Sequence, residues 1–116
     1  MVTVCSSNAV SEITKSVADK SKQIFGRTLK NVILYGSYAR GDYDDESDID
    51  IMILADIPAD ECYKYRKMLL DVTSELGLKF DTLISVNVRD LNTFNKWRNI
   101  LPFYKNINHE GVNIIG

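Results

Sequence analysis

The 116-residue sequence has few of the residues that build metal centres from sulfur and nitrogen. Its two cysteines, Cys5 and Cys62, lie far apart in no C-x-x-C pair, so they fit neither a zinc site nor a disulfide framework and are interpreted as free thiols. A Ser-His-Asp triad would depend on the single histidine, His109, which is expected on the surface near the chain end. Any bound metal should therefore be a hard cation held by oxygen.

Long apolar runs and an excess of basic charge are also missing. No apolar run approaches the roughly 20 residues of a membrane-spanning helix, and residues 1–12 lack the basic and apolar regions of a signal peptide, so a cytoplasmic location is expected. The net charge of −2 argues against general binding to nucleic acid, which needs a basic face to neutralise phosphates. A local site for a small anionic ligand remains compatible with this charge.

The composition, 45% hydrophobic and 26% charged, is that of an ordinary globular protein, and residues 1–116 are predicted to form a single domain. Hydrophobic spacing favours an α/β fold of the α+β kind, a small mixed β-sheet flanked by helices. Pro102 is expected to interrupt the last helix before a final turn through Ile107. The predicted helices are 8–25, 58–77 and a segment from Asp90 to Leu101, and the predicted strands are 31–35, 49–54 and 79–88.

Two aspartates lead into the second predicted strand. Asp48 and Asp50 stand at i and i+2, so their side chains point to one face with Cα atoms about 7 Å apart, and the isoleucines between and after them occupy the other face. Carboxylates so placed can converge on one or two Mg²⁺ ions. Asp81 offers a third carboxylate if the third predicted strand pairs beside the second, and a shared cation would offset the cost of burying it.

A sharp turn at Gly36 and Ser37 ends the first predicted strand. Glycine permits close approach of the backbone, and the serine hydroxyl can donate to a phosphate oxygen. A short helix beginning at residues 38–40 would aim further N–H groups at the same anion. Arg40 can add charge to a phosphate or pair with a carboxylate of the following loop.

The acidic loop after this turn has a simpler interpretation, because charged residues usually lie in solvent. The Ca²⁺ loop of an EF-hand is excluded, since it needs glycine at its sixth position, where this sequence has Ser47 or Asp50. Similarly, a Gly-Ser pair alone is only a turn signal, and an isolated Asp81 is more often an ion-paired structural residue. The residues interpreted as solvated are Asp42, Asp44, Asp45 and Glu46.

Taken together, residues 36–54, GSYARGDYDDESDIDIMIL, resemble the G-S-x-x-R-G and S-D-x-D signature of the minimal nucleotidyltransferases, the MNT proteins of the DNA polymerase β superfamily. Asp81, in FDTLI, resembles the family's third carboxylate. The C-terminal LPFYKNINHEGVNII resembles its closing segment, a helix ending in E-G before an apolar tail. The motif positions matched are Gly36, Ser37, Arg40, Gly41, Ser47, Asp48 and Asp50.

The resemblance implies a polymerase β-like nucleotidyltransferase fold and a Mg²⁺-assisted transfer of AMP from ATP, with pyrophosphate leaving. Two Mg²⁺ ions are expected, and Asp81 would also help to activate the attacking hydroxyl. The nucleotide-binding residues implied are Gly36, Ser37, Arg40 and Ser47. The catalytic and metal-binding residues implied are Asp48, Asp50 and Asp81.

Minimal members of the family are similar to antitoxins that pair with HEPN-domain RNase toxins and transfer AMP to a toxin tyrosine. By this resemblance the partner toxin supplies the acceptor, and the chain is a protein adenylyltransferase in a homo- or hetero-oligomer. Two alternatives stay open. One is a noncatalytic antitoxin module that blocks its partner by contact. The other is a nucleotidyltransferase for an antibiotic-type small molecule, which the lack of room for a further acceptor-binding domain disfavours.

Overall fold

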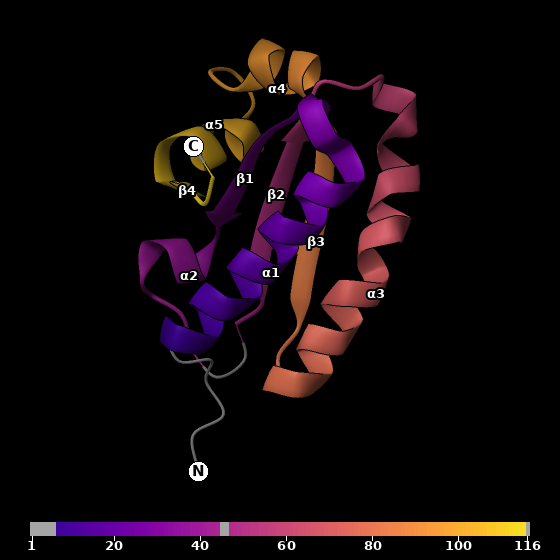
Figure 1. Ribbon diagram of the computed structural model, residues 1–116. Helices are drawn as coiled ribbons and strands as arrows, with labels where there is room; N and C mark the ends of the chain where they lie inside the picture. The colour runs from indigo at the N-terminus through magenta and orange to yellow at the C-terminus, as the bar shows by residue number, and fades with distance from the viewer. Residues whose placement is uncertain (1–6, 45–46, 116) are drawn as a thin grey trace.

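The computed structural model describes residues 7–44 and 47–115, in which helices and strands alternate along the chain (Figure 1). The predictions for Cys5, Asp45 and Glu46 concern residues outside these ranges. The strands are β1 (Leu29–Tyr35), β2 (Ile49–Ala55), β3 (Ile84–Asp90) and β4 (Val112–Asn113). The helices are α1 (Ser7–Phe25), α2 (Ser37–Arg40), α3 (Cys62–Phe80), α4 (Leu91–Trp97) and α5 (Pro102–Glu110), with 3₁₀ turns at Gly26–Thr28 and Ala59–Glu61.

The described strands form one mixed sheet in the order β3-β2-β1-β4, which confirms the predicted fold class. β1 is antiparallel to both β2 and β4, whereas β2 is parallel to β3. Parallel neighbours require a long crossover, and α3 supplies it between β2 and β3. In Figure 1, α1 and α3 lie over one face of the sheet, and α4 and α5 lie toward its other side.

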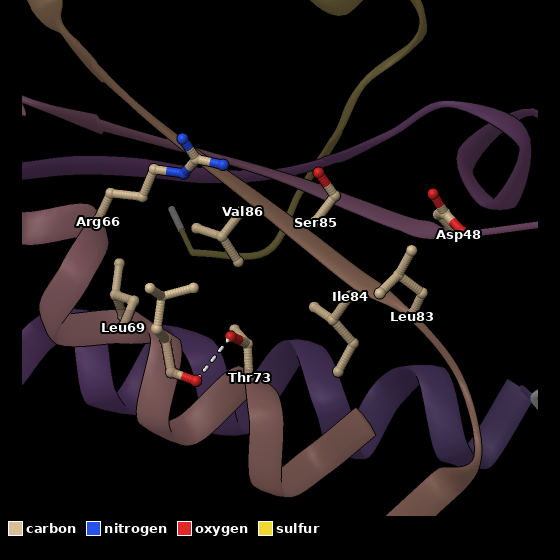
Figure 2. Close-up of a pocket in the computed structure, with 9 residues that line it drawn as sticks. Asp48, Arg66, Leu69, Thr73, Leu83, Ile84, Ser85 and Val86 are labelled. Atoms are coloured by element: carbon tan, nitrogen blue, oxygen red, sulfur yellow. Dashed lines mark hydrogen bonds between the residues drawn. The ribbon is translucent and has the colours of Figure 1, made fainter. Parts of the chain in front are cut away.

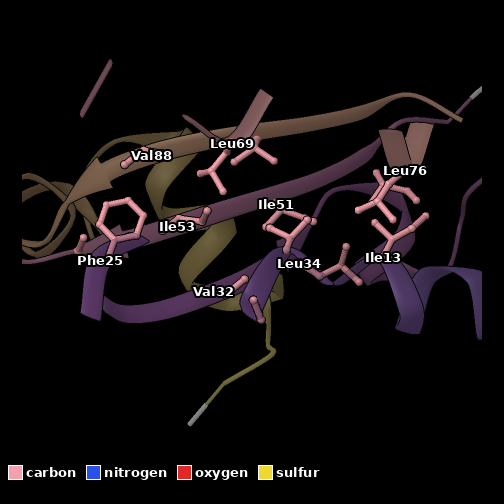
Figure 3. Close-up of a cluster of buried hydrophobic side chains, with 14 residues drawn as sticks. Ile13, Phe25, Val32, Leu34, Ile51, Ile53, Leu69, Leu76 and Val88 are labelled. Atoms are coloured by element: carbon pink, nitrogen blue, oxygen red, sulfur yellow. The ribbon is translucent and has the colours of Figure 1, made fainter. Parts of the chain in front are cut away.

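The main core lies between the sheet and the helices α1 and α3 (Figure 3). Alternate residues of β2 point into it: Ile49, Ile51 and Ile53 are all fully buried. Because side chains alternate along a strand, this burial turns Asp50 and Met52 to the opposite face. The hydrophobic pattern of β2 therefore decides which face carries the acidic side chain.

A smaller core covers part of that opposite face. Met52 and Ile33 pack there with Phe94 of α4 and Ile107 of α5. Asp50 is the next residue of β2 on this face, and it is only partly buried. On this face of the sheet, the enclosed apolar region ends at Met52, and a partly exposed polar region begins two residues away at Asp50.

The third strand begins later than predicted, because α3 extends to Phe80. Residues 79 and 80 belong to α3, which continues through Gly77, and Asp81 caps the helix in the left-handed conformation with φ 52°. Gly77 does not end the helix. Glycine is required there because a Cβ would lie only 2.8 Å from the carbonyl oxygen of Thr82. The chain folds back tightly at this point, so β3 starts only at Ile84.

The C-terminal bounds also differ from prediction. Asp90 caps α4 by accepting a hydrogen bond from the Thr93 N–H at 2.9 Å. Pro102 begins α5 instead of interrupting a helix, since proline suits the first helical position, where no N–H donor is needed. Strand β4 has only two residues, too few to give a pattern in the sequence.

The other predicted elements, helix 8–25 and strands 31–35 and 49–54, are confirmed to within two residues. None of the helices in the described ranges has the length and apolar character that crossing a membrane requires.

Candidate active site

The end of β1 and the start of β2 bring the predicted turn and one predicted aspartate into contact. Tyr35 pairs with Asp50 across the antiparallel strands, and Gly36 follows directly. A Cβ at Gly36 would collide with the Asp50 carboxylate oxygen Oδ2, and the backbone of Gly36 has φ 78°. Glycine is therefore required twice, for the left-handed turn and for the carboxylate packed against it.

The short helix predicted after this turn is confirmed as α2. The Gly36 carbonyl accepts hydrogen bonds from the N–H groups of Ala39 and Arg40, both at 3.1 Å. Ser37 is the first helical residue, so its N–H belongs to the turn whose donors have no partner within the helix. The turn that carries this backbone donor and the Ser37 hydroxyl begins at Gly36, which packs against the Asp50 carboxylate.

The two aspartates repel one another. The pKa of Asp50 is raised, first by burial and second by the negative charge of Asp48, while the charge of Arg40 lowers it. Burial and the charge of Asp48 therefore both disfavour the ionised form of the Asp50 carboxylate when no cation is bound. A hard cation bound by both side chains would relieve the repulsion, and carboxylate oxygens are ligands that Mg²⁺ accepts, so the residues fit this ion.

Asp81 does not join the two aspartates. It is exposed at the end of α3. In the part of the chain that the structure describes, no three His, Cys, Asp or Glu side chains lie close enough together to hold a metal ion. The prediction that Asp81 lies within the third strand is therefore wrong, because Asp81 caps α3 and precedes β3.

Ser85 occupies the position of β3 beside Asp50. The parallel register pairs Asp50 with Ser85 and Met52 with Asn87. In Figure 2 the Ser85 hydroxyl and the Asp48 carboxylate lie on the same side of β3, away from α3. Ser85 lies within the predicted strand 79–88, and the alternation of side chains along β3 puts it on the same face as Asn87.

A groove of about 160 Å³ between α3 and β3 reaches the acidic site. Asp48 and Leu83 lie toward one end, Arg66 and Leu69 lie toward the other, and Ser85 lies between them (Figure 2). Leu83 is 65% exposed, although it directly precedes β3. The site is thus continuous with an apolar surface at the β3 edge of the sheet.

Arg40 adopts the second of its two predicted roles. Its Nε lies 3.2 Å from Asp42 Oδ2 and its Nη1 lies 3.4 Å from Glu110 Oε2. The second ion pair joins the last residue of α2 to the last residue of α5. Gly111 follows, and a Cβ there would collide with Ile33 Cγ2, so the E-G pair of the closing segment fixes the approach of α5 to β1.

Two further polar contacts surround the site. Ser47 closes the acidic loop, because its Oγ accepts from the Asp44 N–H at 2.9 Å. Asn87 Nδ2 donates to the Tyr35 hydroxyl at 2.7 Å. Burial is the main cause that raises the pKa of Tyr35, so this hydroxyl stays protonated at neutral pH. Tyr35 and Asn87 carried no sequence signal, because only the strand register brings them together.

Comparison with known proteins agrees with the resemblance of the signature. The nucleotidyltransferase domain family matches residues 10–111. The chain is 38% identical over 103 residues to MJ0604 of Methanocaldococcus jannaschii, named "Putative protein adenylyltransferase", and the match covers 89% of this chain and 91% of that protein. MJ0141 of the same organism, with the same description, is 43% identical over 75 residues, or 64% of this chain and 73% of that protein.

One solved structure, described as "Crystal structure of the toxin-antitoxin with AMP-PNP", has a TM-score of 0.50 and 20% identity, and the match covers 88% of this chain and 73% of that one. At this identity the likeness bears on the fold alone. The chain belongs to the nucleotidyltransferase domain family, and its fold is that of nucleotidyltransferases. The protein is accordingly a nucleotidyltransferase.

Proposed function

We propose that this protein transfers AMP from ATP, with Mg²⁺, to a tyrosine hydroxyl of a HEPN-domain toxin and thereby acts as its antitoxin. The observation that carries the proposal is the packing of Gly36 against the Asp50 carboxylate, which brings together the turn proposed to bind phosphate and the side chain proposed to bind Mg²⁺. Relatives named as protein adenylyltransferases support a protein acceptor. The likeness to a toxin-antitoxin structure holding AMP-PNP is compatible with the partner and the nucleotide.

The residues divide the work of the reaction. Gly36 and Ser37 would bind the triphosphate through a backbone donor and a hydroxyl. Asp48 and Asp50 would hold Mg²⁺, which when bound neutralises charge on the transferred group. The acceptor oxygen forms a bond to the α-phosphorus as the bond to pyrophosphate breaks, and the hydroxyl proton passes to water. Asp81 is left out of this site because the structure places it at the exposed end of α3.

The test is the intact mass of the partner. The protein is incubated with ATP, Mg²⁺ and the HEPN-domain product of the adjacent reading frame. We expect whole AMP units to be added, and Asp48→Asn or Asp50→Asn to abolish the addition. Asp56→Asn is the matched control, because Asp56 is an exposed aspartate that follows the other end of β2. An unchanged partner mass with the wild-type protein would contradict the proposal.

One observation favours a second candidate, a noncatalytic antitoxin that blocks the toxin by contact. Ser85, not a carboxylate, stands beside Asp50 on β3, and among the described residues no third acidic side chain joins Asp48 and Asp50 in a group that could hold a metal ion. This candidate predicts that Asp48→Asn still neutralises the toxin in a growth assay, whereas the catalytic proposal predicts that neutralisation is lost. A second measurement, binding of the variant to the toxin, separates lost catalysis from lost contact.

A further inference from the structure

A second pocket opens beside the phosphate-binding turn, on the α5 side. It has a volume of about 220 Å³ and is lined by Tyr35, Gly36, Phe103, Asn106 and Glu110, among others. Gly36 borders both this pocket and the Asp50 carboxylate, so the two spaces are neighbours. Pockets for whole drug-sized ligands measure about 300–1,000 Å³, so this one suits a single planar ring while the rest of the ligand lies outside.

The walls of the pocket match such a ring. Tyr35 and Phe103 meet edge to face, with ring centroids 5.9 Å apart and an interplanar angle of 88°. Phe103 is 42% exposed, which leaves aromatic surface for a ligand to stack on. The buried Ile107 forms part of the pocket lining, and the Arg40–Glu110 ion pair lies at its polar side.

Asn106 is the hydrogen-bonding group of this pocket. It is exposed on α5, and no side-chain hydrogen bond joins it to any residue in the described ranges. An amide offers a donor and an acceptor together, which matches the amino group and ring nitrogen at one edge of adenine. Guanine presents two acceptors at the same edge and would leave one amide group mismatched.

We infer that this pocket is the base subsite of the nucleotide site, with the adenine ring of ATP stacked on Phe103 and selected by Asn106. The inference rests on the proposed function for the reaction but concerns binding alone. It adds a residue that chooses the nucleotide, which the signature of residues 36–50 does not contain. The triphosphate would extend from the pocket across Gly36 toward Asp48 and Asp50.

Calorimetric titration of the full chain with Mg²⁺ and no partner tests the inference with three probes: ATP, GTP and inorganic tripolyphosphate. We expect the wild type to bind ATP most tightly. Phe103→Ala should weaken ATP and GTP about 5- to 150-fold, the range for removing an aromatic ring from a stacked base, and leave tripolyphosphate unchanged. Asn106→Ala should lower the preference for ATP over GTP by a similar factor.

Asn108→Ala is the matched control. It removes the same side chain from the same helix, but Asn108 lines a different pocket, with Lys30 and Arg98. Its ATP affinity and nucleotide preference should equal those of the wild type. The exposure of Asn106 makes Asn106→Ala a mild change for folding, and the melting temperatures of all variants are compared with that of Asn108→Ala.

The outcomes separate this inference from the proposed reaction. Equal binding of ATP and GTP by the wild type, or an unchanged ATP preference in Asn106→Ala, would overturn the assignment of the pocket. If AMP still reaches the partner in that case, the proposed function stands without this subsite. If ATP binding follows the expected pattern but the partner mass never changes, the subsite stands and the proposed reaction fails.

Discussion

The two faces of the sheet differ in what β2 contributes to them. One face receives its buried isoleucines, and the other carries Asp50 of the candidate site. On the α1 and α3 face, fourteen buried hydrophobic residues of the described ranges form one cluster. On the other face only five do, and the strand positions beyond them are the partly exposed Tyr35, Asp50 and Ser85. The comparison shows that the larger core sets the register that the site needs, since a shift of one residue would exchange Ile51 for Asp50.

The largest effect should come from breaking the larger core. Ile51 and Met52 are neighbours in β2, both fully buried, one in each cluster. Ile51→Ala should lower the free energy of unfolding by about 3–5 kcal/mol, because the cavity is enclosed on all sides. Met52→Ala should cost less, about 2–3 kcal/mol, because the smaller cluster can relax further. Urea denaturation measures both, and an equal or reversed order would contradict the distinction between the faces.

The second-largest loss of stability is expected at Gly36, in the turn between β1 and α2. Gly36→Ala should lower the free energy of unfolding by about 2–3 kcal/mol, from left-handed strain and from displacement of the Asp50 carboxylate. Gly41→Ala is the control, because Gly41 has φ 88° but no atom within 4 Å of the added Cβ.

Gly41→Ala should cost only about 1 kcal/mol, the strain alone. The excess cost of Gly36→Ala then combines the contact with Asp50 and a backbone conformation less accessible to alanine, with ψ −156° at Gly36 against 5° at Gly41. ATP affinity should fall in Gly36→Ala and stay unchanged in Gly41→Ala. Equal costs in denaturation would show that the carboxylate does not depend on the missing Cβ.

The sequence was sufficient for the elements whose pattern is local. The alternation in β2 identified both its buried face and the face of Asp50, and the turn at Gly36 was visible as a glycine after an apolar run. These features depend on neighbours within a few residues. They could be predicted because period and turn chemistry act over the same short range.

Features set by long-range pairing could not be predicted. The Arg40–Glu110 ion pair joins residues 70 positions apart, and the Asp50–Ser85 pairing depends on the register of a crossover strand. The sequence predicts that the helix ends at Gly77, whereas the folded chain shows that glycine is needed there for the close approach of the Thr82 carbonyl. Because the helix was predicted to end at Gly77, the next strand was predicted to start at residue 79. Asp81 was therefore predicted in a strand, whereas it is the C-cap of α3.

Asp81 gives a smaller test of this correction. Asp81→Gly should raise the free energy of unfolding by about 0.5–1 kcal/mol, because glycine adopts the left-handed cap without strain. Asp81→Asn should leave stability almost unchanged and should not alter the transfer of AMP. Partner mass measured beside Asp48→Asn checks this, and a loss of transfer in Asp81→Asn would restore Asp81 as a third catalytic carboxylate.

The smallest effect is expected at Asp50, where a substitution should raise the free energy of unfolding instead of lowering it as the core variants do. Because burial and the charge of Asp48 raise the pKa of Asp50, the folded protein binds this proton more tightly than the unfolded chain. The resulting stability is fully present below the unfolded pKa of about 3.9 and is lost as pH rises through the folded pKa. At pH 7 ionised Asp50 therefore destabilises the fold.

Asp50→Asn should thus raise the free energy of unfolding at pH 7 in EDTA by less than about 1 kcal/mol, since the side chain is partly exposed. The gain should shrink as the pH falls from 7 toward 4. Adding Mg²⁺ should stabilise the wild type and remove the difference, because the variant lacks one carboxylate ligand. A variant less stable than the wild type at pH 7 in EDTA would show that Asp50 serves the fold, and the contrast between a stabilising core face and a functional acidic face would fail at this residue.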